Sequence, residues 1–387
     1  MLTTVAIKNY RSIRELVVPL SALNLVTGAN GAGKSNLYRA LRLLADTATG
    51  RAVLSLVEEG GLDSCLWAGP ERRAKSTADG APIQGGPRQS SISLQLGFAA
   101  HEGGYLLDFG LPEPVPRTQF GLDPEIKRES IFYGDYFEPR RALIERQGPG
   151  LRARDDAGKW RSLEQTLPSY ESVLSHFGDP ARLPEALHLR EWIRSWRFYD
   201  QFRTDREAPV RKPQVATRTP VLSHDGRDLA AAWQTIVEIG DDEQLSACLD
   251  DAFPGASVEI RKSQGSFELL FHQKGLLRPL TLSELSDGTL RYLLWIAALL
   301  SPRSPGLMVL NEPENSLHPQ LLTPLARLLT LAAERTQVWV ISHADTLIRA
   351  LLDGSDCQHL GLVKRDGETC WQDAGLDTTP PWHWLKR

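Results

Sequence analysis

The chain has 387 residues, of which 41% are hydrophobic and 24% charged, and its 44 basic and 48 acidic side chains give a formal net charge of −4. This composition is typical of a globular protein with one large α/β domain or a core that carries an insertion, and the charge balance excludes a wholly basic nucleic-acid coat protein. The four cysteines are scattered without a C-x-x-C pair, which argues against a disulfide framework or zinc ribbon and favours a cytoplasmic location.

The N-terminal part has the pattern of strand, glycine-rich loop and helix. Residues 1–27 alternate apolar and polar side chains and end in a short apolar run before glycine, which indicates a buried strand that enters a turn. From Lys34 onward, apolar residues recur at helical spacing, which predicts a helix with one buried face. The chain start lacks a signal-peptide pattern, and the longest strongly apolar run, 293–300, falls far short of the ~20 residues of a membrane span. We therefore expect neither export nor membrane insertion.

The loop between this strand and helix satisfies the pattern G-x-x-x-x-G-K-[ST] in full. Its residues, with the one that follows, are Gly28, Ala29, Asn30, Gly31, Ala32, Gly33, Lys34, Ser35 and Asn36. Such a loop directs backbone N–H groups at phosphate oxygens, and the helix N-terminus adds partial positive charge. We expect Lys34 to reach the β and γ phosphates of ATP or GTP and Ser35 to ligate Mg²⁺. The alternative is a glycine-rich turn without a ligand.

The middle of the chain is less regular. Residues 70–90 predict a flexible surface loop, 91–96 and 105–109 predict antiparallel strands, and 178–250 are largely helix-permissive. Further strands are expected at 257–261 and 267–272. After them the pattern alternates helix (283–301), strand (307–310), helix (319–334) and strand (337–341). This alternation favours parallel strands covered by helices.

Three groups in this last block carry candidate chemistry. Glu312 follows the first strand, where a carboxylate can act as general base or water-positioning group, although a Glu here is otherwise a solvated loop residue. His343 follows the second strand and is equally consistent with a structural histidine. Ser286 and Gly288 open the first helix, either as an anion-binding helix N-terminus or as a plain cap.

Taken in order, these segments resemble the ABC-type ATPases of the RecF, SMC and OLD kind, including stand-alone bacterial ATPases. IKNYRSI and LNLVTGANGAGKSNLYRALRLL resemble their opening strands, Walker A loop and first helix, and LSDGTLRYLL resembles a divergent signature motif. LMVLNEPENSLHP resembles Walker B with the D-loop, and VWVISHA resembles the switch-histidine strand. The resemblance covers about 1–46 and 280–345. It implies a P-loop NTPase, an α/β ABC-ATPase head with a mixed sheet and an inserted, largely helical lobe.

The resemblance also implies domain limits and a mechanism. The head would comprise 1–130 and 276–387, with the lobe at 131–275. Two chains would form an ATP-dependent homodimer that encloses two ATP molecules. Ser286 and Gly288 of one chain would touch the γ-phosphate held by the other, and Ser316 would lie in the D-loop near the dimer interface. Glu312 would position water, His343 would sense the γ-phosphate, and Arg11 would lie near the nucleotide.

The sequence departs from the family pattern at three places. Asn311 replaces the usual acidic Walker B residue, so a negative charge near Mg²⁺ is missing, and we expect slow turnover with a high Mg²⁺ requirement. Asp287 and Thr289 replace the usual Gly and Gln of the signature. A Q-loop glutamine is not evident, Gln147 and Gln165 being the candidates.

An arginine-rich segment from Arg190 to Arg218 contains Trp192, Trp196 and Tyr199. Arginine contacts to phosphate with base stacking on the aromatic rings would suit DNA binding. The same rings at i, i+4 and i+7 equally predict a helical core stripe with arginines on the solvent face, which we favour.

The sequence thus predicts a Mg²⁺-dependent ATPase whose dimerisation controls a DNA-linked process such as repair or phage defence. The alternative is an ATP-gated scaffold with vestigial hydrolysis that holds a separately encoded effector such as a nuclease or toxin. That effector would be separate because the segment after His343 is too short for the nuclease domain of OLD-type proteins. A transporter subunit or a small-molecule kinase fits the motifs less well.

Overall fold

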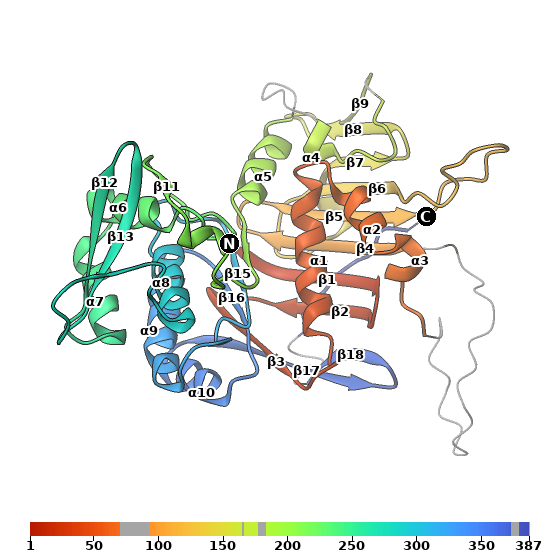
Figure 1. Ribbon diagram of the computed structural model, residues 1–387. Helices are drawn as coiled ribbons and strands as arrows, with labels where there is room; N and C mark the ends of the chain where they lie inside the picture. Colours follow the sequence, from red (N-terminus) through yellow and green to blue (C-terminus); the bar gives the residue numbers. More distant parts are fainter. Residues whose placement is uncertain (70–90, 92, 165, 177–182, 373–378, 387) are drawn as a thin grey trace, which may run out of the picture. The chain divides into compact units, whose positions relative to one another are not determined.

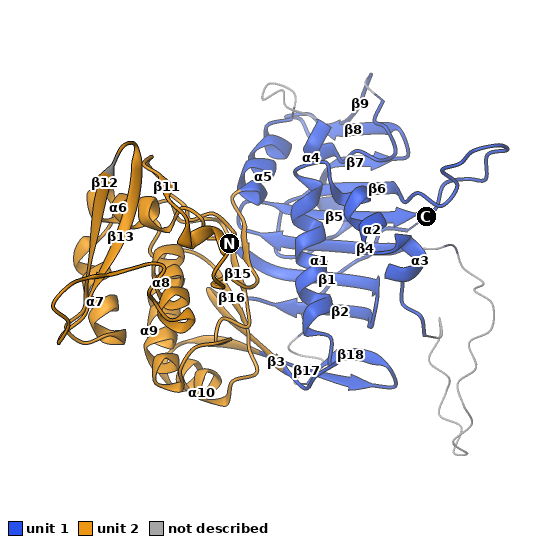
Figure 2. Ribbon diagram, viewed as in Figure 1, with its two compact units in different colours: residues 1–20, 28–194, 360–387 blue, residues 21–27, 195–359 orange. Residues whose placement is uncertain are grey.

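The computed structural model describes residues 1–69, 91, 93–164, 166–176, 183–372 and 379–386 (Figure 1). The chain divides into two compact units: unit 1 contains residues 1–20, 28–194 and 360–387, and unit 2 contains residues 21–27 and 195–359 (Figure 2). The predicted surface loop 70–90 and Gln165 lie outside the described residues.

Unit 1 is built on an eight-stranded antiparallel sheet in the order β2-β1-β4-β5-β6-β7-β8-β9. The strands are β1 (Leu2–Tyr10), β2 (Ile13–Pro19), β4 (Leu94–Ala100), β5 (Gly104–Gly110), β6 (Glu125–Phe132), β7 (Ala142–Gln147), β8 (Gly150–Arg154) and β9 (Trp160–Leu163). The helices are α1 (Lys34–Thr47), α2 (Ala52–Glu58), α3 (Gly61–Cys65), α4 (Val173–His176) and α5 (Pro184–Arg194), with the 3₁₀ turn η1 (Pro139–Arg141). The expected pairing of β4 with β5 is confirmed, with Leu96 opposite Leu107.

Helix α1 has the buried stripe that the sequence predicts. Leu37, Ala40, Leu41 and Leu44 are all buried, and the helix packs against β1 and β4. Burying this stripe contributes roughly 1.5–3 kcal/mol per large apolar side chain. The packing holds the N-terminus of α1, and hence the loop before it, in a fixed place within unit 1.

Unit 2 contains four parallel strands in the order β10-β15-β16-β3. They are β10 (Arg197–Tyr199), β15 (Met308–Asn311), β16 (Val338–Ile341) and β3 (Leu23–Gly28), whose final glycine belongs to unit 1. Helices of this unit are α6 (Leu229–Ile239), α7 (Asp242–Ala252), α8 (Asp287–Leu299), α9 (Leu322–Ala333) and α10 (Asp345–Gly354), with 3₁₀ turns η2 (Pro209–Arg211) and η3 (Pro319–Leu321). A small antiparallel sheet contains β11 (Gln214–Val215), β12 (Ser257–Ser263), β13 (Ser266–His272) and β14 (Leu280–Thr281).

The parallel arrangement expected from the alternating pattern is confirmed in unit 2. Helix α8 is buried on nearly every side from Leu290 to Leu299 and packs with α6, α7 and α9 (Figure 1). Trp295 lies at the centre of this core, with its ring 4.8 Å from that of Phe202. A helix that is apolar all round must be enclosed by other elements, and this one is.

The chain returns from unit 2 to unit 1 within strand β17 (Cys357–Arg365). The strand begins in unit 2, where His359 Nε2 lies 2.7 Å from Thr27 Oγ1. It ends in unit 1, where it pairs antiparallel with β18 (Glu368–Trp371). The segment after it packs Trp382 and Trp384 against a unit 1 cluster that contains Phe132 and Phe137.

Two features of the middle segment differ from expectation. Residues 131–275, predicted as one lobe, are divided between the units at Arg194 and Ser195, and they contain strands as well as helices. The predicted helical stripe is wrong, because α5 ends at Arg194 and Tyr199 lies in β10, paired with Leu310 of β15. Trp196 and Tyr199 are nevertheless buried core residues. No helix among the described residues combines the length and the apolar character that membrane crossing requires.

Candidate functional site

The phosphate-binding loop lies in unit 1 between the end of β3 and the start of α1. Gly28, Gly31 and Gly33 have φ of 150°, 81° and 111°, a region that residues with a Cβ rarely occupy. Gly33 is the N-cap of α1 and makes no side-chain capping bond, so the first N–H groups of the helix remain available to an anion. The expected strand, loop and helix order is confirmed.

Lys34 is the charged group of this loop. Its side chain is 8% exposed, and Nζ donates to the carbonyl of Gly28 at 2.6 Å. The ammonium is therefore held beside the backbone that phosphates would approach. Ser35 and the loop tip from Ala29 to Gly31 are exposed. The Lys34 ammonium and the loop N–H groups suit the phosphates of a nucleoside triphosphate, and the Ser35 hydroxyl suits a hard divalent cation.

A hydrogen-bond chain supports the loop from within unit 1. Thr369 of β18 donates from its hydroxyl to the carbonyl of Ala32 at 2.8 Å, and its Oγ1 lies 2.7 Å from Ser12 Oγ. Asn36 Nδ2 donates to the same Ser12 oxygen at 2.7 Å. A Cβ at Gly33 would lie 2.1 Å from Thr369 Oγ1, so glycine is required there. The supporting roles of Ser12 and Thr369 were not predicted, because no local sequence pattern links residues so far apart.

Arg11 lies in the turn between β1 and β2 with φ of 50°. Its Nη2 donates to Glu59 Oε2 at 2.7 Å, and Tyr10 donates from its hydroxyl to the same oxygen at 2.7 Å. Burial acts to raise the pKa of Glu59, but the hydrogen bonds from Arg11 and Tyr10 outweigh it and hold the pKa below its usual value. The guanidinium thus has a carboxylate partner within unit 1, and a contact with nucleotide stays a prediction.

The acidic candidates lie at the carboxyl edge of the parallel strands in unit 2. Asn311 pairs in register with Ile341, and Ile341 with Val26, so β15, β16 and β3 end at the same level. Glu312 directly follows β15, His343 is the second residue after β16, and Glu312 Oε1 lies 3.6 Å from His343 Nδ1. Asn315 Nδ2 donates to Glu312 Oε2 at 2.9 Å. The structure therefore brings the predicted water-positioning carboxylate and the switch histidine together.

Glu314, which was not among the predicted site residues, is buried beside them. Its Oε1 accepts from the Ser342 hydroxyl at 2.7 Å and from the His343 N–H at 2.9 Å, and it lies 3.5 Å from His343 Nδ1. A carboxylate two residues past Glu312 was the available signal in the sequence.

The signature-like residues open helix α8. Ser286 is its exposed N-cap and accepts from the Thr289 N–H at 3.2 Å, while Asp287 pairs with Arg211 at 2.9 Å. A Cβ at Gly288 would lie 3.0 Å from the Ser316 carbonyl, which places the predicted signature beside the predicted D-loop of the same chain. Buried Arg291 fixes this contact, because Nη1 donates to Asn315 O at 2.5 Å and Nη2 to Phe202 O at 3.0 Å.

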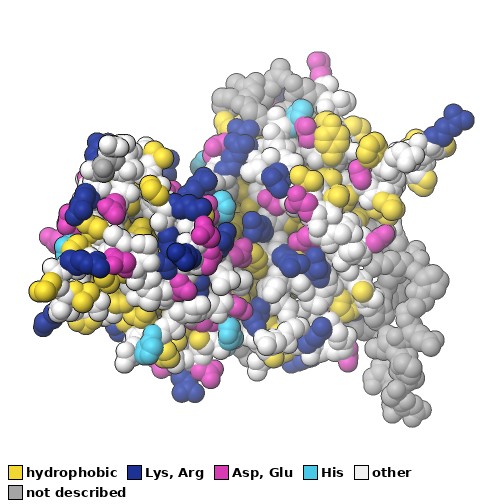
Figure 3. All heavy atoms as spheres, in the orientation of Figure 1, with side chains coloured by type: hydrophobic (Ala, Val, Ile, Leu, Met, Phe, Trp, Pro, Cys, Tyr) yellow, Lys and Arg dark blue, Asp and Glu magenta, His cyan; other side chains and the backbone are white. Residues whose placement is uncertain are grey.

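The arginines of the segment 190–218 make many contacts within their own units. Arg194 Nε donates to Ala48 O at 3.2 Å, Arg203 pairs with Asp205 at 2.9 Å, and Arg211 donates to Leu285 O at 3.1 Å. On the face seen in Figure 3, basic side chains are interspersed with acidic ones in both units. That face therefore carries mixed charge.

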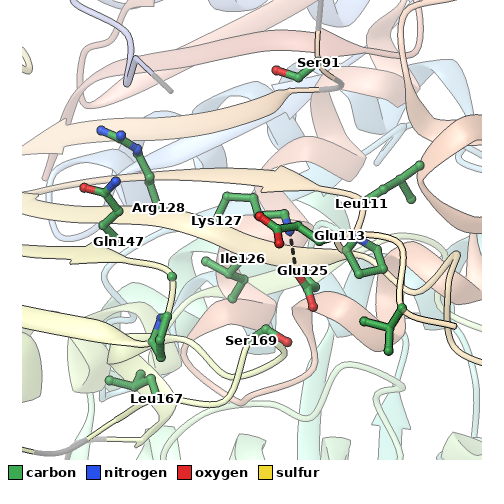
Figure 4. A pocket seen from close by; sticks show the side chains of 14 residues that line it. Ser91, Leu111, Glu113, Glu125, Ile126, Lys127, Arg128, Gln147, Leu167 and Ser169 are labelled. Atoms are coloured by element: carbon green, nitrogen blue, oxygen red, sulfur yellow. Dashed lines mark hydrogen bonds and ion pairs between the residues drawn. The ribbon is translucent and has the colours of Figure 1, made fainter. Parts of the chain in front are cut away.

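A cavity of about 770 Å³ lies in unit 1, beside the first half of β6 (Figure 4). Its lining includes Arg128, Gln147 and Lys127, whose Nζ pairs with Glu125 at 2.5 Å. The lining contains no residue of the phosphate loop, so this cavity is separate from the candidate site.

A family model described as "AAA domain, putative AbiEii toxin, Type IV TA system" matches residues 23–349. The chain belongs to this AAA family. The match extends from β3 and the phosphate loop through the strand before His343 into α10, so it includes the predicted motifs except the opening segment 7–13, which contains Arg11. No curated protein matches the AAA-family chain in sequence.

Solved structures resemble the AAA-family chain over almost its whole length. An SMC head bound to the C-terminal winged-helix domain of ScpA is 13% identical, with a TM-score of 0.50, and the match covers 97% of this chain and 98% of that one. An SMC head from Thermotoga maritima is 15% identical (TM-score 0.42; 97% and 99% covered). One from Pyrococcus furiosus with an extended coiled coil, bound to the C-terminal domain of ScpA, is 13% identical (TM-score 0.46; 95% and 94% covered). The predicted α/β fold class, that of a P-loop ATPase of the ABC and SMC kind, is confirmed.

Proposed function

We propose that this protein binds ATP with Mg²⁺ and hydrolyses it slowly. The observation that carries the proposal is the complete phosphate-binding loop between β3 and α1. Its Lys34 side chain donates a hydrogen bond to the carbonyl of Gly28, the first residue of the loop. Lys34 and the loop N–H groups would bind the phosphates, and Ser35 and Asn311 would hold the cation through a hydroxyl and an amide oxygen, which are suitable ligands for Mg²⁺.

Hydrolysis needs a group that orients water against the γ-phosphate, and Glu312 is the candidate. Its carboxylate lies 3.6 Å from His343 Nδ1, so the two side chains can respond together to the charge of the γ-phosphate. The uncharged Asn311 attracts the cation less than an aspartate would, which is why we propose a slow reaction with a high Mg²⁺ requirement.

We also propose that two chains share each nucleotide. Support comes from the exposed N-terminus of α8, where Ser286 and Gly288 present a helix end that suits the γ-phosphate bound by a second copy. Because each nucleotide would contact residues of both chains, nucleotide binding and assembly would be coupled.

The cellular role that we propose is control of a DNA-linked process, such as repair or phage defence, in the cytoplasm. The location is supported by four free cysteines, at positions 65, 248, 357 and 370. Asn311 favours a second candidate, an ATP-gated scaffold in which hydrolysis is vestigial and a separately encoded effector is held or released. DNA is the partner to test for the first function, and the separately encoded effector is the partner to test for the scaffold.

Phosphate release and mass measurement separate these functions. The wild-type protein should bind fluorescent ATP, release phosphate with Mg²⁺, and dimerise at high concentration with ATP, and Glu312→Gln should keep the dimer while abolishing release. An ATP-dependent dimer without phosphate release, even when DNA is added, would favour the scaffold. Absence of ATP binding would contradict both.

A further inference from the structure

Glu314 connects the turn that follows β15 to the end of β16. Its side chain is 6% exposed, and its Oε1 accepts two hydrogen bonds from the first two residues after β16, from the Ser342 hydroxyl and the His343 N–H. Within the turn that follows β15, the Glu314 carbonyl accepts a hydrogen bond from the Leu317 N–H at 3.0 Å. One carboxylate oxygen therefore fixes the backbone on which His343 stands.

The same oxygen also acts on the imidazole ring. Glu314 Oε1 lies 3.5 Å and Glu312 Oε1 lies 3.6 Å from Nδ1 of His343. The His343 side chain is 53% exposed. Two carboxylates on the Nδ1 side favour a proton on that nitrogen. Nε2, on the opposite edge of the ring, is then the atom left for another partner.

The charge of Glu314 needs an explanation beyond its hydrogen bonds. A neutral amide oxygen could accept from Ser342 and from the His343 N–H equally well. A carboxylate is costly to bury, and Oε2 of Glu314 is buried without a hydrogen-bond partner among the described residues. The negative charge is accounted for if it acts on the ring of His343.

We propose that Glu314 is a positioning residue that holds His343 with its proton on Nδ1 and ties that ring to the turn after β15. A movement of this turn, which contains Glu312 and Ser316, would then move His343 with it. The expected effect of Glu314 on kcat rests on the proposed function. The contacts of Glu314 with Ser342 and His343 do not, because they involve only residues of unit 2.

The test compares Glu314→Gln with Glu334→Gln, which makes the same charge change at an exposed residue after α9. Glu314→Gln should lower kcat roughly ten- to a hundredfold, the effect of misplacing a reacting group, and should leave the Kd of fluorescent ATP within about twofold. Glu334→Gln should match wild type in both. In a His343→Ala background, Glu314→Gln should lower kcat no further, because it acts through that ring.

A second readout does not depend on activity. In ¹⁵N-histidine spectra, with the His343 signals identified by their loss in His343→Ala, the ring should have its proton on Nδ1 in wild type, and its signals should shift in Glu314→Gln but not in Glu334→Gln. If Glu314→Gln prevents folding, Ser342→Ala, which removes one of the two anchors, should give a smaller shift of the same signals.

The outcomes separate the two proposals. Equal kcat for the two glutamine variants, or a further loss in the His343→Ala background, would overturn the role of Glu314 while leaving the ATPase intact. If wild type binds no ATP, the proposed function fails, and the histidine spectra alone decide: unchanged His343 signals in the Glu314 variant would overturn the positioning role as well.

Discussion

Thr369 donates a hydrogen bond from its side-chain hydroxyl to the carbonyl of Ala32 at 2.8 Å, so a strand near the C-terminus supports the phosphate-binding loop. The same oxygen lies 2.7 Å from Ser12 Oγ, which in turn accepts from Asn36. The loop is thus held by side chains from two distant segments, Ser12 and Thr369, together with Asn36 of α1, and its shape depends on them as well as on its own glycines.

Removing the Thr369 hydroxyl should weaken ATP binding. Thr369→Val keeps the shape of the side chain but leaves Ala32 O without its donor, a loss of about 1 kcal/mol, or roughly fivefold in Kd. Titration with fluorescent ATP measures the change. Thr330→Val is the matched control, because it removes a hydroxyl bond to Ala326 O within α9 of unit 2 and should leave Kd unchanged. Equal affinities for both variants would contradict the supporting role.

The sequence predicted the part of the site that is local. Strand β3, the loop and α1 follow from one motif and one periodic stripe, and Glu312 and His343 follow from two buried runs that each end in a polar residue. That these two side chains meet could be expected, because parallel strands end at one edge.

Contacts over long sequence separation were not predictable. Ser12 and Thr369 meet only because β18 returns to the loop, and Glu314 meets Ser342 only because β15 and β16 are neighbours. The stripe of Trp192, Trp196 and Tyr199 failed for a similar reason. Helical spacing was present, but the chain leaves the helix after Arg194 because Tyr199 pairs with Leu310, a residue from a distant strand.

Arg291 should be a major source of stability in unit 2. It is 5% exposed, its Nε is buried without a partner among the described residues, and its other nitrogens donate to the carbonyls of Asn315 and Phe202. Burial lowers its pKa. Arg291→Met should cost about 3 kcal/mol, because it leaves buried carbonyls without donors. Urea denaturation measures this cost.

The control for Arg291 is Arg327→Met. Arg327 is 57% exposed and pairs with Asp251 at 2.6 Å, so its loss should cost less than about 1 kcal/mol. If the two methionine variants are equally stable, the buried arginine does not hold the D-loop as the hydrogen bonds indicate.

Glu59 should make stability depend on pH in the acid range. Its pKa is below the ordinary 4.5, because hydrogen bonds from Arg11 and Tyr10 outweigh the effect of burial. A depressed folded-state pKa gives stability that is present above about pH 4.5 and is lost as the pH falls through the folded-state value. Wild type should therefore exceed Glu59→Gln in stability at pH 7, by about 1 kcal/mol or less given solvent screening, and the difference should shrink below pH 4.5.

Chemical denaturation between pH 3 and pH 7 measures that difference. Glu58→Gln serves as control, because Glu58 is 58% exposed and lies 3.6 Å from Arg51. A pH-independent difference between wild type and Glu59→Gln would show that the Arg11 contact does not shift the carboxyl group as described.

Asn311→Asp should raise the rate of phosphate release severalfold or lower the Mg²⁺ midpoint, because a carboxylate restores the charge that attracts the cation. Asn311→Ala, which removes the amide oxygen from the end of β15, should act in the opposite direction. Magnesium titrations of steady-state phosphate release compare the three proteins. If Asn311→Asp changes neither quantity, this side chain does not contribute to cation binding.

Mixing two inactive variants tests most directly the central claim that two chains share each nucleotide. Lys34→Ala should fail to hold phosphate, and Ser286→Arg should block the helix end that contacts it, so each variant alone should release no phosphate. Mixed together, they can form one intact site, because the Ser286→Arg chain keeps a normal phosphate loop and the Lys34→Ala chain keeps a normal Ser286. The account predicts that phosphate release returns in the mixture. A mixture that stays inactive, or a Ser286→Arg protein that hydrolyses ATP at the wild-type rate at every concentration, would contradict it.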